Sequence, residues 1–291
     1  MRRAVLALML VAALPHPAWS SKPDGPVDAI GMVDYRHGPG FKVGDWVKYR
    51  TTGESLQGYR TDYTVTVLIA GEEMWWGEKC FWVETQTSYS GQPAELAASL
   101  ISYGIFSDSL PTRRFGRYMR KYLDGVDPAG GFTQQPFLRA RTEITNRHFA
   151  EFEPEREVDT LGVHRIEVPK GAFDALRVRQ VYREKKLEQE GDSTVYFEMV
   201  EDHSHWWSDR VPITHLVRID QENVQRRRVW MIGESDNAPL QVVELSTGGT
   251  ELLDFGTGMK SLTIPERFQR PVSEQRAAPK KPAPARRRPS G

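Results

Sequence analysis

The sequence predicts an α+β fold that is mainly β, with one large antiparallel sheet and a helical insert. Three observations indicate this class. From Asp45 onward, runs rich in Val, Thr, Tyr and Trp alternate between apolar and polar residues, which is typical of half-buried strands. Connections such as 70–72 and 190–192 are short, so neighbouring strands should pair antiparallel. Two stretches between the early and late strands switch to helical spacing.

Period-two alternation of apolar side chains marks the predicted strands. In the segment 60–69, every second residue from Tyr63 is aromatic or aliphatic, so one face of a strand would be buried. The segment 175–187 places Leu176, Val178, Gln180 and Tyr182 on one face in the same way. Strands are predicted at 45–52, 60–69, 79–88, 138–147, 162–168, 175–187, 194–200, 216–220, 225–232 and 240–246.

Two helices are predicted between these strands, and each begins at a proline that suits the first helical position. The first, 93–104, repeats Leu96, Leu100 and Tyr103 at spacings of four and three. The second, 111–123, places Phe115, Met119, Tyr122 and Leu123 on one side. Its cations could lie on anionic lipid, but we expect its apolar side to pack on the sheet while they face solvent or the acidic core. These cations are Arg113, Arg114, Arg117, Arg120 and Lys121.

Residues 1–20 have the three parts of a secretory signal. A charged start precedes an apolar run at 4–14, and a small-x-small exit ending at Ser20 follows, so we expect cleavage after that serine. The apolar run is shorter than the about 20 residues that span a bilayer, and Pro15 and Pro17 disfavour a longer N-terminal anchor. The sequence therefore predicts a periplasmic or secreted protein of a bacterial envelope, with no transmembrane segment after cleavage.

Composition divides the remaining chain into three parts. Residues 21–40 are rich in proline and glycine and should form an extended lead-in. Residues 41–264 are expected to form a single β-rich domain. Residues 265–291 combine prolines with Lys and Arg and few large apolar side chains, so a disordered basic tail is predicted. Cys80 is the only cysteine, which excludes an intrachain disulfide and lipidation after the signal.

The charges are unevenly distributed although the whole chain is neutral. Residues 1–20 carry +2 and residues 265–291 carry +6, so residues 21–264 carry −8. An acidic domain repels nucleic acid, and we expect no nucleic-acid partner. The tail could instead bind an anionic envelope polymer through its cations Lys280, Lys281, Arg286, Arg287 and Arg288.

One pair of side chains suggests metal chemistry. His203 and His205 are two residues apart, so on a strand both imidazoles would point to the same face and could reach one cation. Spacing reveals no third or fourth ligand, and a polar strand end is the more common interpretation. The sequence contains no Gly-x-Ser-x-Gly elbow, and Cys80 lies in an apolar alternation that predicts a buried, inert thiol. We therefore predict no catalytic residue, metal or cofactor, and the ligand-binding residues are unknown.

Two tryptophan pairs, Trp75-Trp76 and Trp206-Trp207, have two interpretations. Adjacent residues on a strand face opposite sides, so each pair would place one ring inside the sheet and one outside. An outward ring suggests a protein partner, a lipid or a glycan surface, whereas packing at a sheet edge explains it equally well.

Three segments together resemble exported bacterial proteins of the lipoprotein-carrier-like half-barrel superfamily, which includes domains of unknown function. They are VGDWVKYR at 43–50, VPKGAFDALRV at 168–178, and the segment from Tyr196-Phe197 through Trp206-Trp207-Ser208-Asp209 to His215-Leu216-Val217-Arg218. The resemblance implies an incomplete antiparallel barrel, that is, a large curved sheet that wraps around helices. It also implies an apolar concavity, which relatives use for acyl chains. The chain departs from the family by lacking a lipidation cysteine and by its basic tail.

Three functional hypotheses follow. The first is an exported, non-enzymatic envelope protein that binds a lipid-like or apolar ligand in a half-barrel cavity. The second is a structural or interaction module whose basic tail binds anionic envelope polymer. The third is a metal-dependent hydrolase that uses His203 and His205. We rank the hypotheses in this order.

Overall fold

The computed structural model describes residues 33–34, 38–90, 94–108, 117–126, 132–135, 155–232 and 239–275. Within them the chain forms one eleven-stranded sheet in the order β6-β5-β4-β3-β2-β1-β11-β10-β9-β8-β7. The strands are β1 (Trp46–Ser55), β2 (Arg60–Trp75), β3 (Glu78–Tyr89), β4 (Glu95–Ser102), β5 (Met119–Val126), β6 (Phe132–Gln135), β7 (Glu155–Val168), β8 (Gly171–Glu190), β9 (Ser193–Trp207), β10 (Leu216–Met231) and β11 (Gln241–Gly256).

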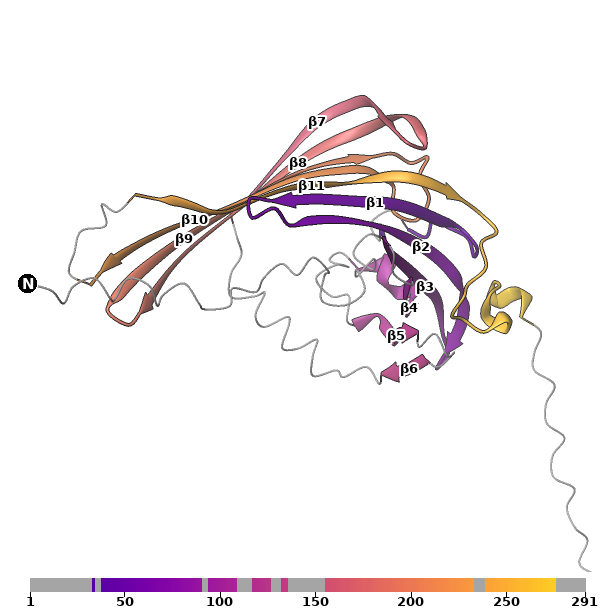
Figure 1. Ribbon diagram of the computed structural model, residues 1–291. Coiled ribbons are helices and arrows are strands. Elements are labelled where there is room, and N and C mark those ends of the chain that lie inside the picture. Colours follow the sequence, from indigo (N-terminus) through magenta and orange to yellow (C-terminus); the bar gives the residue numbers. More distant parts are fainter. Residues whose placement is uncertain are drawn as a thin grey trace, which may run out of the picture.

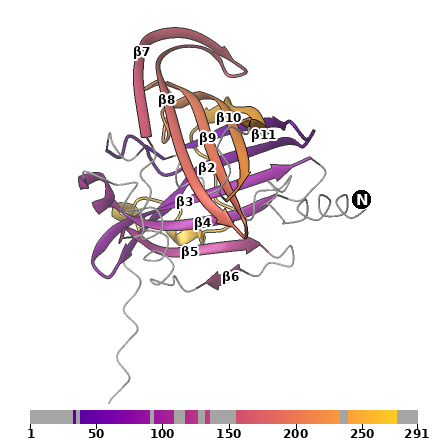
Figure 2. The ribbon, with the colours of Figure 1, turned by 90° about the vertical axis from the view of Figure 1, so that its left-hand side faces the viewer.

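The sheet consists of two antiparallel meanders joined by one pair of strands. The meander β1–β6 and the meander β7–β11 meet where β1 pairs with β11, from Trp46 opposite Gly256 to Ser55 opposite Ser246. Figures 1 and 2 show that β6 and β7 lie at opposite ends of the strongly curved sheet. The structure therefore confirms a mainly β fold with a large, curved, open antiparallel sheet.

The two faces of the sheet differ in what covers them. We define the inner face as the one that carries Tyr49, Val65 and Val67, and the outer face as the one that carries Leu68 and Trp82. The short 3-10 helix η2 (Tyr103–Ser107) lies under the curl of the sheet, whereas η4 (Glu266–Phe268) and η5 (Val272–Glu274) lie outside it (Figure 1). The structure has two apolar clusters: the smaller lies on the outer face of β2–β4, and the larger fills the inner face of β1–β4 and extends to Phe173, Ala175 and Trp206 at the ends of β8 and β9.

The inner cluster is the larger core. Its β-branched and aromatic side chains on β1–β4 pack against Phe41, Ile105 and the loop 208–215. Tyr49 is fully buried, and its hydroxyl donates to the carbonyl oxygen of Leu216 at 2.8 Å. Burial raises the pKa of Tyr49 well above its ordinary value. This phenol therefore serves as a neutral donor that fixes the loop between β9 and β10 to the inner face.

The outer cluster lies beneath residues 259–275, which we call the C-terminal strap. Met259, Ile264 and Phe268 of the strap pack on Leu68, Trp82 and other apolar residues of β2–β4. Buried Glu84 accepts hydrogen bonds from the backbone N–H groups of Leu262 and Thr263, at 3.2 and 3.1 Å, and from three side chains. These side chains are Gln86, Ser261 and Thr263.

A second buried carboxylate holds the far end of the strap. Glu72 accepts the backbone N–H of Val272 at 2.8 Å and the Tyr103 hydroxyl at 2.7 Å, and it pairs with Lys79 at 2.9 Å. Gln275 donates to the carbonyl oxygen of Glu72 at 2.7 Å. Backbone donors that would otherwise remain unpaired thus meet carboxylates already placed on the sheet.

The predicted helical insert is wrong. The segment 93–104 forms β4 and the start of η2, and the described end of the segment 111–123 lies in β5. Because β4 is buried on both faces, its apolar residues run almost without interruption. Leu96 and Leu100 fit either structure, since a spacing of four keeps residues on one side of a helix and on one side of a strand. Residues 91–93 and 109–116 lie outside the described residues.

Two other expectations change. The predicted strands 216–220 and 225–232 form the single strand β10. The predicted tail begins later than Pro265, because residues 265–275 form η4 and η5 and pack on β2 through Phe268. The predicted strand 138–147 and the tail from residue 276 lie outside the described residues.

Candidate functional site

A row of side chains crosses eight strands of the inner face in register. It runs from the open edge at β7 to β3, and we call it the middle row. Its members alternate between hydroxyl, aliphatic and aromatic groups, and most are half-buried. They are Thr160, Val178, His205, Ile219, Thr250, Thr51, Tyr63 and Tyr89.

The neighbouring row on the core side is apolar. We call it the apolar row, and it comprises Val163, Leu176, Trp207, Leu252, Tyr49 and Val65. Leu252, Tyr49 and Val65 are buried in the inner core. Toward the β7 edge the row becomes exposed, with Leu176 at 38% and Val163 at 68% exposure. Apolar surface therefore extends from the core to the open edge of the sheet.

The neighbouring row on the other side is polar. We call it the polar row; from β8 to β1 it comprises Gln180, His203, Gln221, Gly248 and Gly53, and exposed Val158 extends it on β7. Successive rows are two residues apart, so the three rows together span about 13 Å along the strands. Within that distance the inner face changes from buried hydrocarbon to half-buried amides and an imidazole.

The structure places both predicted histidines on the inner face, with ring centroids 6.0 Å apart. His205 stacks on Trp207 at 5.7 Å with an interplanar angle of 3°, and His203 lies 5.9 Å from the Tyr182 ring. The nearest carboxylate oxygen to His203, from Glu201, is 3.9 Å from Nε2. In the described parts of the chain, no group of three or more His, Cys, Asp or Glu side chains could hold a metal ion. The imidazoles belong to an aromatic ladder along β9.

The two tyrosines of the middle row supply neutral hydroxyls. The rings of Tyr63 and Tyr89 are 5.5 Å apart. Burial, with a contribution from the nearby charge of Glu95, raises the pKa of Tyr89 to about 12. Burial also raises the pKa of Tyr63, although a hydrogen bond with Thr51 opposes the shift. Both groups keep their protons at neutral pH, so they can donate hydrogen bonds to a ligand.

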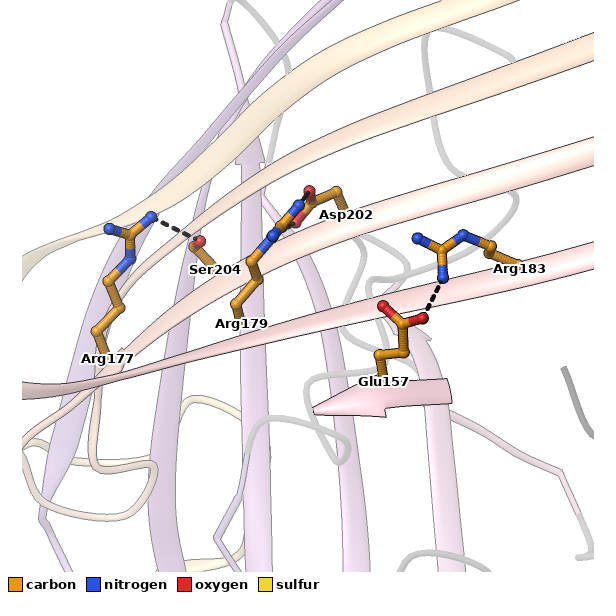
Figure 3. A network of polar contacts seen from close by, with 6 residues as sticks. All are labelled: Glu157, Arg177, Arg179, Arg183, Asp202 and Ser204. Atoms are coloured by element: carbon orange, nitrogen blue, oxygen red, sulfur yellow. Dashed lines mark hydrogen bonds and ion pairs between the residues drawn. The ribbon is translucent and has the colours of Figure 1, made fainter. Parts of the chain in front are cut away.

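The outer face of the same strands carries a ladder of arginines. Figure 3 shows Arg177, Arg179 and Arg183 of β8 reaching toward Ser204, Asp202 and Glu157. Arg179 Nε lies 3.0 Å from both carboxylate oxygens of Asp202, and this hydrogen bond lowers the pKa of Asp202. These groups are paired and partly exposed, so within the described residues this part of the outer face presents charged side chains to solvent.

Trp206 and Trp207 confirm the predicted alternation, whereas Trp75 and Trp76 do not. Trp206 lies on the outer face, near Arg177 and Arg218 at 5.0 and 5.7 Å, while Trp207 lies in the apolar row. Trp75 ends β2 and Trp76 lies in the following turn, where the two rings stack on each other. The prediction assumed that both residues of each pair lie within a strand, which holds only for the later pair.

A small polar pocket lies on the outer face at the junction of the meanders. Its volume is about 210 Å³, and its lining includes Thr52, Arg218, Asp220, Gly249 and Glu251. A Cβ atom on Gly249 would lie 2.6 Å from the carbonyl oxygen of Ile219, so only glycine leaves this space. Arg218 is already paired with Asp220 at 2.6 Å. The pocket therefore offers few free polar groups for a ligand.

Cys80 confirms the predicted inert thiol. It is fully buried, and burial raises its pKa to about 11. A thiol with such a pKa is almost entirely protonated at neutral pH and is a poor nucleophile.

Sequence reasoning left the ligand-binding residues unknown, and the structure explains why. Alternation alone placed Leu176, Val178 and Gln180 on one face of β8. Their partners on β11 and β1 are distant in the sequence, and the pairing of β1 with β11, which includes Thr51 opposite Thr250, brings the two meanders together. The rows are a property of the register between strands, which no local pattern contains.

Comparison with known proteins gives similarity to solved structures alone. No protein-family model and no curated protein matches the chain. A candidate lipoprotein from Parabacteroides distasonis is 11% identical, with a TM-score of 0.32 and coverage of 77% of this chain and 99% of that chain. A candidate exported protein with a YmcC-like fold from Bacteroides fragilis is 10% identical, with a TM-score of 0.30 and coverage of 76% and 98%.

A third similar structure is a LolA superfamily protein from Nitrosomonas europaea. It is 8% identical, with a TM-score of 0.24 and coverage of 81% of this chain and 96% of that chain. The chain thus bears a weak likeness to exported proteins of the kind that the three sequence segments resemble. In the described part of the chain, no helix has the length and hydropathy needed to cross a membrane.

Proposed function

We propose that this protein is an exported, non-enzymatic envelope protein that binds a lipid-like or apolar ligand along the inner face of its open sheet. The observation that carries the proposal is the sequence of three rows, from apolar through mixed to polar, across the inner face. An amphiphilic ligand has the same order of groups. Its hydrocarbon part would lie on the apolar row and its polar end on the amides of the polar row.

The exposed end of the apolar row supports this assignment. Val163 and Leu176 expose apolar surface beside half-buried Trp207. Covering such surface with an acyl chain removes it from water and stabilises the complex by about 25 cal/mol for each Å². The open edge at β7 provides a route by which a long chain could reach the inner face without unfolding the core.

The polar row supports a ligand whose polar end forms hydrogen bonds. Gln180 and Gln221 flank His203 on the adjacent strands, and an amide both donates and accepts. The Tyr182 hydroxyl donates to the Gln180 side-chain oxygen at 2.6 Å, which orients that amide. Amide and hydroxyl groups of this kind are better suited to binding an uncharged or zwitterionic headgroup than to catalysis.

Ligand uptake by delipidated protein tests the proposal. We expect saturable binding of a fluorescent fatty acid or phospholipid at micromolar concentrations. Replacing Leu176 with Gln should weaken binding about tenfold, because a polar group then faces the hydrocarbon chain. Leu187→Gln is the matched control, since Leu187 lies exposed on the opposite face of the same strand. The absence of uptake by the parent protein, or equal loss in both variants, would refute the proposal.

The basic segment beyond the strap remains a separate prediction. Residues 276–291, with Lys280 and Lys281, lie outside the described residues. Their binding to anionic envelope polymer is tested by truncation after residue 275. Envelope retention should then be lost, and unchanged retention would refute this hypothesis.

A further inference from the structure

The turn between β2 and β3 has an unusual residue at its first central position. Trp76 has φ = 49° and Gly77 has φ = 85°, the left-handed pair typical of a type I′ hairpin turn. Asn or Asp normally precedes the glycine, because a bulky side chain is strained at positive φ. Strain of this kind is retained where the exposed side chain has a use.

The Trp76 side chain projects almost entirely into solvent. It is 91% exposed and stacks on Trp75, with ring centroids 5.6 Å apart and an interplanar angle of 17°. Met74, at the end of the same strand, is also exposed. Two large apolar side chains near the end of one hairpin are therefore exposed to solvent.

The base of this stack is held in place by a partly buried lysine. Lys121 of β5 lies 3.8 Å from the centroid of the Trp75 ring and 2.7 Å from a carboxylate oxygen of Glu73. Trp82 donates its indole N–H to the same carboxylate at 3.2 Å. The contact with Lys121 therefore fixes the Trp75 ring, and the Trp76 ring stacks on this fixed ring.

The charge around the hairpin end differs in sign from that of the domain. The segments 72–79 and 117–121 contain four cations and three carboxylates, including Glu72, which pairs with Lys79, so they carry +1, whereas residues 21–264 carry −8. Lys79 and Arg117 are exposed, and Arg120 pairs with Glu78 at 2.7 Å. An otherwise acidic molecule therefore has a cationic margin around its most exposed tryptophan.

We propose that this hairpin end docks on an anionic lipid bilayer. Trp76 and Met74 would enter the interface between headgroups and acyl chains, where indole rings are favoured. Arg117 would contact the lipid phosphates. A bilayer requires no complementary shape, whereas a stable protein partner needs about 800 Å² on each side. Two side chains on a turn offer far less than that. This inference does not depend on ligand binding at the inner face.

Vesicle flotation of the full chain tests the proposal. We expect binding to vesicles made of equal parts of phosphatidylglycerol and phosphatidylcholine, and weaker binding at high salt. Trp76→Asn should reduce binding roughly tenfold. Because asparagine suits the first position of a type I′ turn, the melting temperature of this variant should stay unchanged or rise. Loss of binding would then report the indole and not the fold.

Two further variants separate the contributions. Leu56→Asn is the matched control, since Leu56 is an exposed apolar residue in the turn between β1 and β2, and it should bind as well as the parent. Arg117→Glu should weaken binding to the anionic vesicles only. Equal binding by Trp76→Asn and the parent would overturn the proposal. So would binding that is indifferent to phosphatidylglycerol, or capture of a glycan or protein at this hairpin without vesicle binding.

Discussion

The outer face of the sheet accommodates charged carboxylates in two different environments. Over β2–β4 the C-terminal strap covers the face and buries Glu84, while buried Glu72, which pairs with Phe81 across the hairpin, accepts a backbone donor from the far end of the strap. Over β7–β10 the face stays open, and Arg179 and Asp202 pair in partial contact with solvent. Carboxylates occur on both parts, but only the buried ones receive backbone donors. The hydrogen-bond partners of a carboxylate, rather than its charge, therefore decide whether it stabilises the fold.

The largest effect is expected at Glu84. Glu84→Ala would leave the N–H groups of Leu262 and Thr263 and two hydroxyls without their acceptor in a buried place. We expect a loss of at least about 3 kcal/mol in the free energy of unfolding, measured by chemical denaturation. Glu157→Ala on the open part should change it by less than about 0.5 kcal/mol. Similar losses at the two positions would erase the distinction.

The next effect concerns the contact between the strap and β2. A Cβ atom on Gly71 would lie 2.0 Å from the carbonyl oxygen of Phe268. Gly71→Ala should therefore displace the strap and destabilise the protein by about 1–3 kcal/mol, with faster amide exchange at Phe268 and Gln269. Gly53→Ala is the control, because its Cβ would meet nothing nearer than 3.5 Å. If exchange in the strap is unchanged in Gly71→Ala, the strap does not pack there.

A pH effect is expected at Glu72. Burial would raise the pKa of Glu72, but hydrogen bonds from Tyr103 and Val272 and the ion pair with Lys79 together lower it below the ordinary glutamate value of 4.5. A lowered pKa in the folded state stabilises the protein above the ordinary value, and this stability is lost as pH falls through the lowered pKa. Protection of the Val272 amide should therefore decrease on acidification below about pH 4.5.

The variant Glu72→Gln tests the source of that pH dependence. It should be less stable than the parent at neutral pH and should lose less protection between neutral and acidic pH. An unchanged pH profile in this variant would show that another group titrates.

The smallest effect is expected in the ladder of arginines on β8. A double-mutant cycle on Arg179 and Asp202 should give only a small coupling, which decreases with added salt, because water screens an exposed ion pair. A coupling as large as the loss at Glu84 would mean that the open face is as important to the fold as the covered one.

Most strands could be predicted from sequence, because a strand that is buried on one face shows its alternation locally. The segment 60–69 and the segment 175–187 are examples, and both lie inside longer strands of the structure. The strand β4 could not be predicted, since burial of both faces removed the alternation and left the spacing of Leu96 and Leu100 ambiguous. The strap was missed because its polar residues find buried partners that are far away in the sequence.

The candidate site could be predicted only in part. The shared face of Leu176, Val178 and Gln180, and that of His203 and His205, followed from alternation along single strands. Their place beside Thr250 and Thr51 required knowledge that the last strand pairs with the first. The Trp76 turn could have been recognised from its Trp-Gly pair between two strand patterns, but the connection was predicted at 70–72, which lies inside β2.

The pairing of β1 with β11 also affects how the chain is made. Thr51 and Thr250 are separated by 199 positions in the sequence, so β1 leaves the ribosome long before its neighbour exists. Until β11 is complete at residue 256, the two meanders of the nascent polypeptide cannot be fully joined. Each meander then has an unpaired edge strand. Closing so long a loop is a late and slow step of folding. An incomplete chain therefore cannot complete its sheet before its last strand has been made.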